Sequence, residues 1–226
     1  MDSTTVLLIL ISTICVWAKD HDDLLNTCID ADSHKYLPGP ESDLHGECVP
    51  YHERACCTQN TTTSFHVQDV WAGFTWNHCS GHVLSDTCKQ WFLKDKCFYE
   101  CSPNVGPWIV EHSIRIRNER FMHVPFCASQ CSSWWAACRN DFTCLDNWSK
   151  GFNYSTGVNT CPTGKVCRPF HTVWPTASAF CEQVWGHSFK VVPDNQPCFK
   201  LDFTGSNPND VVASYYFRQH QGSIFG

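Results

Sequence analysis

The chain has 226 residues, a formal net charge of −6 at pH 7 and a pI of about 6.0. This balance gives no electrostatic footprint for nucleic acid or for an anionic membrane surface, so we expect neither as a partner. The aromatic content of 14%, with 10 Trp, indicates a real core and also suits a pocket for a flat ligand.

The N-terminus reads "MDSTTVLLILISTICVWAKD", with an apolar run from Val6 to Val16 before a small residue, Ala18. This pattern predicts a secretory signal peptide over residues 1–18, cleaved after Ala18. The run is too short for a membrane span, and no other segment approaches 18 apolar residues. We therefore expect one mature domain over residues 19–226.

The signal contains Cys15, so its removal leaves 16 of the 17 cysteines. In an oxidising compartment this even number indicates up to eight disulfides. Zinc is the alternative, because Cys97–Cys101 and Cys127–Cys131 are close pairs. Secretion, the unpatterned spacing of the rest and the adjacent Cys56–Cys57 favour disulfides, although spacing alone leaves their pairing open.

Residues 28–69 are rich in Pro, Gly, Asp, His and Thr, which predicts loop and short strand. A helix is expected over Asp86–Cys101, with Ser85 as its N-cap and Pro103 as its stop. In "FLKDKCFYECSP", Cys97 and Cys101 would then share one helix face while Asp95 and Tyr99 share another. One face is suited to cross-linking and the opposite face to a polar, aromatic contact.

Three more helices are expected along the chain. The first follows Pro125, where cysteines and tryptophans recur at spacings of three, four and seven, and its Trp134 and Trp135 should lie in the core. The second spans Ala177–Trp185, and the third lies in "NPNDVVASYYFRQH", beginning at Asn207 or Pro208. The predicted fold class is therefore α+β: a disulfide-rich single globular domain of several helices, short strands and long loops.

Asn60, Asn147 and Asn153 each begin an Asn-x-Ser/Thr sequon, so we expect surface positions that carry glycans. No nucleophile elbow, zinc-binding His-Glu-x-x-His helix or phosphate-binding glycine loop is present, and the 12 His are scattered. We expect a binding protein and not an enzyme.

Several segments together resemble the folate receptor family: "KYLPGPESDLHGEC", "ACCTQNTT", "FTWNHCSG", "CFYECSPNVGPW", "VPFCASQCSSWWAAC", "FTCLDNWSKGFNYSTG", "CRPFHTVWPT", "WGHSFKV" and "NPNDVVASYY". The match runs from about Cys28 to Tyr216. It implies the disulfides Cys28–Cys56, Cys48–Cys97, Cys57–Cys101, Cys79–Cys167, Cys88–Cys138, Cys127–Cys198, Cys131–Cys181 and Cys144–Cys161.

The resemblance also implies a folate site. Asp95 matches the aspartate that accepts two hydrogen bonds from the pterin, and Tyr99 and Trp185 match the aromatics on its two faces. Ser188 matches a further hydrogen-bonding partner. Arg117 and Arg120 match the arginines at the pterin oxygen and ring nitrogen.

The remaining site residues depart from the family pattern. Ile116 stands where the family usually has a tryptophan along the aminobenzoate section. The loop expected at the glutamate end keeps Lys150, Gly151 and Asn153, but has Ser149, Phe152 and Tyr154 in place of a histidine and two tryptophans. A pocket tyrosine before "FTWNHC" is missing, and Trp71 is close enough in sequence to substitute for it.

These features predict an extracellular, monomeric, high-affinity protein that captures folate and reduced folates for uptake, transport or storage, without a cofactor. Two alternatives stay open: a carrier for another flat heterocycle such as riboflavin, and a protein–protein receptor on the same scaffold. We expect secretion, because no hydrophobic tail of a GPI signal follows "RQHQGSIFG"; a GPI-anchored cell-surface form is the alternative if the C-terminus is incomplete. For acidic release, histidines are expected to titrate, because an Asp95 paired with donors should have a lowered pKa.

Overall fold

The computed structural model describes residues 24–224, so the predicted signal and its cleavage site lie outside the described residues. The elements are, in chain order, η1 (Gly46–Tyr51), α2 (Gln59–Val67), α3 (Asp86–Cys101), η2 (Gly106–Trp108), β1 (Ile109–Ile114), β2 (Arg117–Phe121), β3 (Val124–Cys127), α4 (Ala128–Cys138), β4 (Phe142–Thr143), β5 (Arg168–Pro169), α5 (Phe170–Val173), α6 (Ala177–Gln183), β6 (Phe189–Val192) and α7 (Asn209–Ile224).

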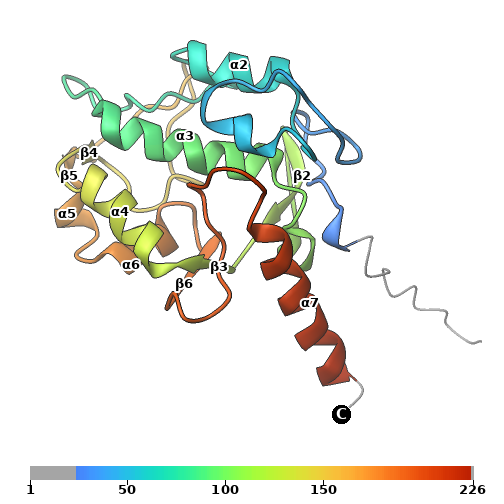
Figure 1. Cartoon of the computed structure of the whole chain (residues 1–226). Coiled ribbons are helices and arrows are strands. Elements are labelled where there is room, and N and C mark those ends of the chain that lie inside the picture. Colours follow the sequence, from blue (N-terminus) through green and yellow to red (C-terminus); the bar gives the residue numbers. More distant parts are fainter. Residues whose placement is uncertain (1–23, 225–226) are drawn as a thin grey trace, which may run out of the picture.

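Helix α3 runs through the middle of the molecule, with η1 packed on one side and α4 on the other (Figure 1). Its predicted bounds are confirmed. The Ser85 hydroxyl accepts the Cys88 N–H at 3.4 Å, which satisfies one of the unpaired donors of the first turn. Ser102 is extended and ends the helix, one residue before Pro103.

The expectation of loop and short strand over residues 28–69 was wrong for η1 and α2, while most of the remaining segment consists of turns, bends and isolated bridges. The Thr58 hydroxyl caps α2 by accepting the Thr61 N–H. Only Thr62 and Phe65 of α2 are buried, so the helix lacks the repeating apolar positions by which an amphipathic helix is recognised.

The helices after α3 follow the predictions closely. Helix α4 begins directly after Cys127, and α7 begins at Asn209, whose side chain bonds the backbone N–H and C=O of Lys200. Helix α6 begins at the predicted Ala177 but ends at Gln183. Gly186 there has φ +56°, and a Cβ on it would lie 2.9 Å from the Asn147 amide, so glycine allows both the turn and this close approach.

The strands form three two-stranded sheets: β1–β2 antiparallel, β3–β6 parallel and β4–β5 antiparallel. Hairpin β1–β2 is irregular between Glu111 and Ile114. The β3–β6 pair aligns Val124 with Phe189, and the Val124 N–H donates to the Ser188 carbonyl. This pairing brings the segment after α6 beside the end of β2.

The core is mainly aromatic. Trp134 is fully buried, as expected, and the half-buried Trp135 packs on Phe180 with ring centroids 5.5 Å apart. The largest fully buried aromatic side chains are Tyr51, Phe92, Phe98, Phe121, Phe126, Trp134, Phe170, Trp174, Phe180, Phe189 and Phe199.

All eight disulfides implied by the family resemblance are confirmed. Two of them, Cys48–Cys97 and Cys57–Cys101, attach α3 to the N-terminal segment that contains η1. These two disulfides confirm the predicted cross-linked face of α3. The eight disulfides together with the mixture of helices and strands confirm the α+β, disulfide-rich fold class.

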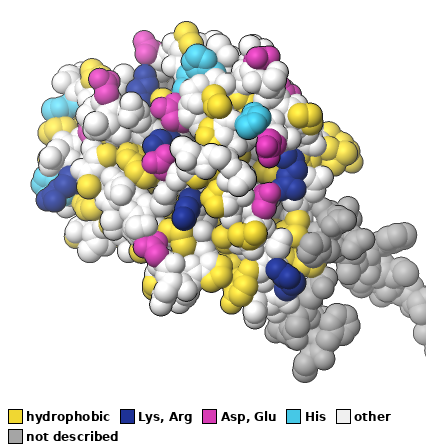
Figure 2. All heavy atoms as spheres, viewed as in Figure 1, with side chains coloured by type: hydrophobic (Ala, Val, Ile, Leu, Met, Phe, Trp, Pro, Cys, Tyr) yellow, Lys and Arg dark blue, Asp and Glu magenta, His cyan; other side chains and the backbone are white. Residues whose placement is uncertain are grey.

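Acidic and basic side chains are scattered among one another over the face drawn in Figure 2. Within residues 24–224, no helix combines the length and apolar character needed to cross a bilayer.

Candidate ligand-binding site

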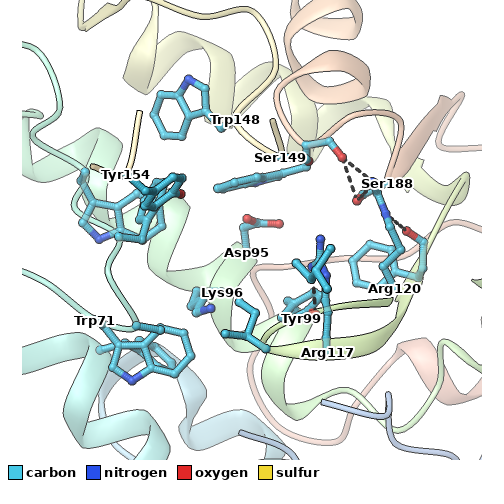
Figure 3. A pocket seen from close by; sticks show the side chains of 18 of the residues that line it. Trp71, Asp95, Lys96, Tyr99, Arg117, Arg120, Trp148, Ser149, Tyr154 and Ser188 are labelled. Carbon is cyan, nitrogen blue, oxygen red and sulfur yellow. Dashed lines mark hydrogen bonds between the residues drawn. The ribbon is translucent and has the colours of Figure 1, made fainter. Parts of the chain in front are cut away.

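A cavity of about 210 Å³ opens beside α3, opposite the face that carries Cys97 and Cys101. Its walls come from α3, the β1–β2 hairpin, the end of α2 with the segment that follows it, the segment after α6, and Trp148, Ser149 and Tyr154. The sequence-predicted site residues that line it are Asp95, Tyr99, Ile116, Arg117, Arg120, Ser149, Tyr154, Trp185 and Ser188 (Figure 3). Residues far apart in the chain thus meet at one site.

Asp95 projects into the middle of this cavity, and its side chain is only 5% exposed. Neither carboxylate oxygen accepts a hydrogen bond from a residue within 24–224. The Trp185 indole N–H approaches the carboxylate and lowers its pKa, but the approach falls outside hydrogen-bond geometry. The Asp95 carboxylate therefore keeps its acceptors directed at the cavity.

Burial is the main influence on Asp95. Loss of water raises its pKa from 3.8 to about 7, and the nearby Trp185 and Lys96 offset only part of this effect. The expected low pKa therefore does not hold for the protein groups alone, because a lowered value needs donors that a ligand must supply. Buried His78 behaves in the opposite way, since burial lowers its pKa to about 4.

Arg120 fixes one end of the site. Its Nη2 lies 2.6 Å from the Trp185 carbonyl oxygen, 2.9 Å from that of Gly186 and 2.9 Å from Ser188 Oγ. These contacts hold the turn after α6 against β2, and burial lowers the Arg120 pKa. Arg120 and Ser188 are both buried, with 8% and 9% exposed.

Arg117 supports the opposite aromatic wall. Its Nη1 donates to the Tyr99 hydroxyl at 3.0 Å, while its Nε is buried with no acceptor among the described residues. Arg117 thus holds Tyr99 in place and keeps an unused donor beside the cavity. Burial raises the pKa of Tyr99, so its hydroxyl stays protonated at neutral pH.

Several aromatic walls were not among the predicted site residues. Phe74, Trp76 and Trp148 line the cavity, and Trp148 packs perpendicular to Trp185 at 5.7 Å. They belong to segments that resemble the family, but no spacing rule marks them as ligand contacts. Trp71 also lines the cavity, in agreement with its suggested role as a substitute for the missing tyrosine.

The predicted glutamate-end loop lies mostly off the cavity. Lys150, Gly151 and Asn153 are exposed, and none of them is part of the cavity wall. Phe152 is also absent from the wall, and its ring packs 4.8 Å from His78 instead. A left-handed Gly151, with φ +95°, turns the chain here, so only Ser149 and Tyr154 at the two ends reach the cavity.

The comparisons with known proteins support the resemblance seen in the sequence. A family model described as "Folate receptor family" matches residues 27–200. The chain is 42% identical to folate receptor gamma of Homo sapiens, over 88% of this chain and 83% of that protein. It is 39% identical to folate receptor alpha of Homo sapiens, over 97% and 90%, and 32% identical to the riboflavin-binding protein of Gallus gallus, over 82% and 74%. The chain belongs to the folate receptor family.

Proposed function

We propose that this protein binds folate and reduced folates with high affinity, for uptake, transport or storage. The observation that carries the proposal is the buried Asp95 carboxylate, whose two oxygens face an aromatic-walled cavity. A pterin presents two adjacent N–H donors along its amino-pyrimidinone edge, and a carboxylate can accept both.

The surrounding residues fit the rest of the pterin. Tyr99 and Trp185 supply flat walls, as stacking on the ring faces requires. Arg117 brings a donor without a partner, and Arg120 with Ser188 closes the polar end of the site. The pterin is therefore expected with its donor edge at Asp95 and its oxygen and ring nitrogen toward the arginines.

The same geometry favours folate over riboflavin. The flavin pyrimidine edge presents one N–H between two carbonyl oxygens, so a carboxylate placed against it would accept one hydrogen bond and face two acceptors. The Asp95 carboxylate would then accept fewer hydrogen bonds from the ligand, while the free-energy cost of burying its charge would remain. The riboflavin-binding relative thus indicates a shared scaffold, and the ligand is decided by the site.

The eight disulfides need an oxidising compartment, so we propose that the protein functions outside the cell, as a secreted monomer without a cofactor or catalytic activity. The test is a titration of the secreted protein with folate and, in parallel, with riboflavin. Folate should quench tryptophan fluorescence at nanomolar concentrations, because Trp185, Trp148 and Trp71 line the cavity. Tight riboflavin binding with weak folate binding would reverse the assignment, and binding of neither would favour the protein–protein receptor.

A further inference from the structure

A second cavity, also of about 210 Å³, adjoins the folate cavity. The two share the wall residues Trp71, Ala72, Lys96, Tyr99, Ile116 and Arg117. The remaining walls of the second cavity are mostly polar and include Asp32, Ser33 and Glu100. Lys96 directly follows Asp95 in the chain, and its side chain stands at the boundary between the two cavities.

Lys96 is held in place as a charged group. Its Nζ lies 2.8 Å from the Glu100 Oε1 atom and 3.9 Å from the centre of the Trp71 ring. Although burial opposes ionisation of Glu100, Lys96 and other neighbours hold the pKa of Glu100 below its usual value. Glu100 is therefore ionised at neutral pH and faces Lys96 as a carboxylate.

The Lys96 ammonium is nevertheless free to take a second anion. Its Nζ carries three N–H donors, and the 2.8 Å contact with one oxygen of Glu100 occupies at most one of them. Glu100 has support of its own: its other oxygen accepts from Ser33 Oγ at 2.7 Å, and His34 Nδ1 lies 3.6 Å away. The Lys96 side chain keeps 21% of its surface exposed.

The position of Lys96 matches the direction that a bound folate would take. Figure 3 shows Lys96 and Trp71 on one side of Asp95, with Arg120 and Ser188 on the other side. A pterin held at the Arg120 end would extend its aminobenzoyl-glutamate toward Trp71 and Lys96. In the proposed complex Arg117 and Arg120 face the pterin oxygen and ring nitrogen, so among the described wall residues Lys96 is the cation left for the tail.

We propose that Lys96 is a specificity-determining residue that pairs with a carboxylate of the glutamate tail, in place of the expected Lys150 in the 149–154 loop. The inference rests on the proposed folate function. Asp32 is exposed at the rim of the second cavity and Glu100 lies behind Lys96, so the tail carboxylate stays at the boundary and does not enter the second cavity.

The test compares two ligands of equal shape: folate and its diamide, in which both tail carboxylates are replaced by neutral amides. Each is titrated into the secreted wild type, Lys96→Met, Lys96→Arg and Lys150→Met. The measured quantity is the ratio of the two dissociation constants for each protein. A change that merely deforms the wall weakens both ligands together and leaves this ratio unchanged.

We expect the wild type to prefer folate by about tenfold, equal to about 1.4 kcal/mol, which is near the lower end for a hydrogen bond to a charged group. Lys96→Met should bring the ratio to about one, while Lys96→Arg and Lys150→Met keep the wild-type ratio. The proposal would be overturned if Lys96→Met kept the wild-type ratio, or if Lys150→Met brought the ratio to about one. Either result would leave the folate function intact. A wild type that binds neither ligand would overturn both.

A salt titration of the wild type keeps the proposal testable if Lys96→Met is not secreted. Added salt screens a partly exposed ion pair, so the preference for folate over its diamide should decrease between about 0.05 and 1 M salt. A preference that stays constant over this range would contradict a role for the Lys96 charge.

Discussion

Replacing Asp95 with alanine removes the carboxylate at the centre of the cavity while leaving the disulfide-bonded face of α3 untouched. In the proposed complex, two pterin donors would then be buried without acceptors. Removing one side of a desolvated, charged hydrogen-bonded pair costs about 2 to 5 kcal/mol. At about 1.4 kcal/mol per tenfold, folate affinity should fall by roughly thirtyfold to several thousandfold.

The raised pKa of Asp95 reduces this loss only slightly. With a pKa of about 7, more than half of the carboxyls are already ionised at pH 7.4, so deprotonation before binding costs only a few tenths of a kcal/mol. The titration should nevertheless be performed at pH 7.4 or above, where the wild type has its full affinity.

The assay is tryptophan-fluorescence titration of folate into the secreted wild type, Asp95→Ala and a matched control, Asp69→Ala. Asp69 lines the same cavity but is exposed, so its loss should change affinity by less than about threefold. Thermal melting verifies that all three proteins are folded. If the folate affinity of Asp95→Ala stays within about threefold of wild type, other residues must accept the hydrogen bonds of the pterin donor edge, and the assigned ligand orientation is wrong.

Three further predictions follow from the same structure. Folate affinity should be constant above about pH 7 and fall by up to tenfold per pH unit below it, because the free Asp95 carboxyl then binds a proton that folate must displace. Asp95→Asn should abolish this pH dependence, and a wild-type affinity that stays constant down to about pH 5.5 would refute the prediction. Without ligand, Asp95→Asn should melt at a higher temperature than wild type at pH 7.4 and equally at about pH 4, as calorimetry can test. Mass spectrometry of the secreted protein should find glycans on the exposed Asn60 and Asn153, and a lower fraction of glycosylated Asn147, because the half-buried Asn147 amide faces Gly186. Full glycosylation of Asn147 would contradict that packing.

The sequence was sufficient for α3, because its signals are local. Ser85, Pro103 and the four-residue spacings of Asp95–Tyr99 and Cys97–Cys101 lie within one helix, and helix geometry alone puts the two pairs on different faces. The disulfide pairing was different, since sixteen cysteines allow many connectivities and only the resemblance to the family selected the one observed.

The parts that could not be predicted depend on contacts between distant segments. Ser33 bonds Glu100 across 67 residues, and this contact supports the charge pair that places Lys96 in the cavity wall. The 149–154 loop shows the reverse: its residues match the family by position, but the backbone turn at Gly151 directs most of them away from the cavity. Neither effect has a signature in local spacing.

The thermal-stability prediction links the fold to the function through one group. An aspartate whose pKa rises on folding binds its proton more tightly in the folded state, so its contribution to stability is fully favourable below pH 3.8 and is lost as the pH rises to about 7. The rise in the Asp95 pKa from 3.8 to about 7 corresponds to a destabilisation of the folded state by at most about 4 kcal/mol at neutral pH. A ligand that supplies two donors to the carboxylate would recover part of this energy as affinity. Asp95→Asn should therefore gain stability and lose folate, whereas equal melting temperatures at pH 7.4 would show that Asp95 is solvated well enough to remain charged at no cost.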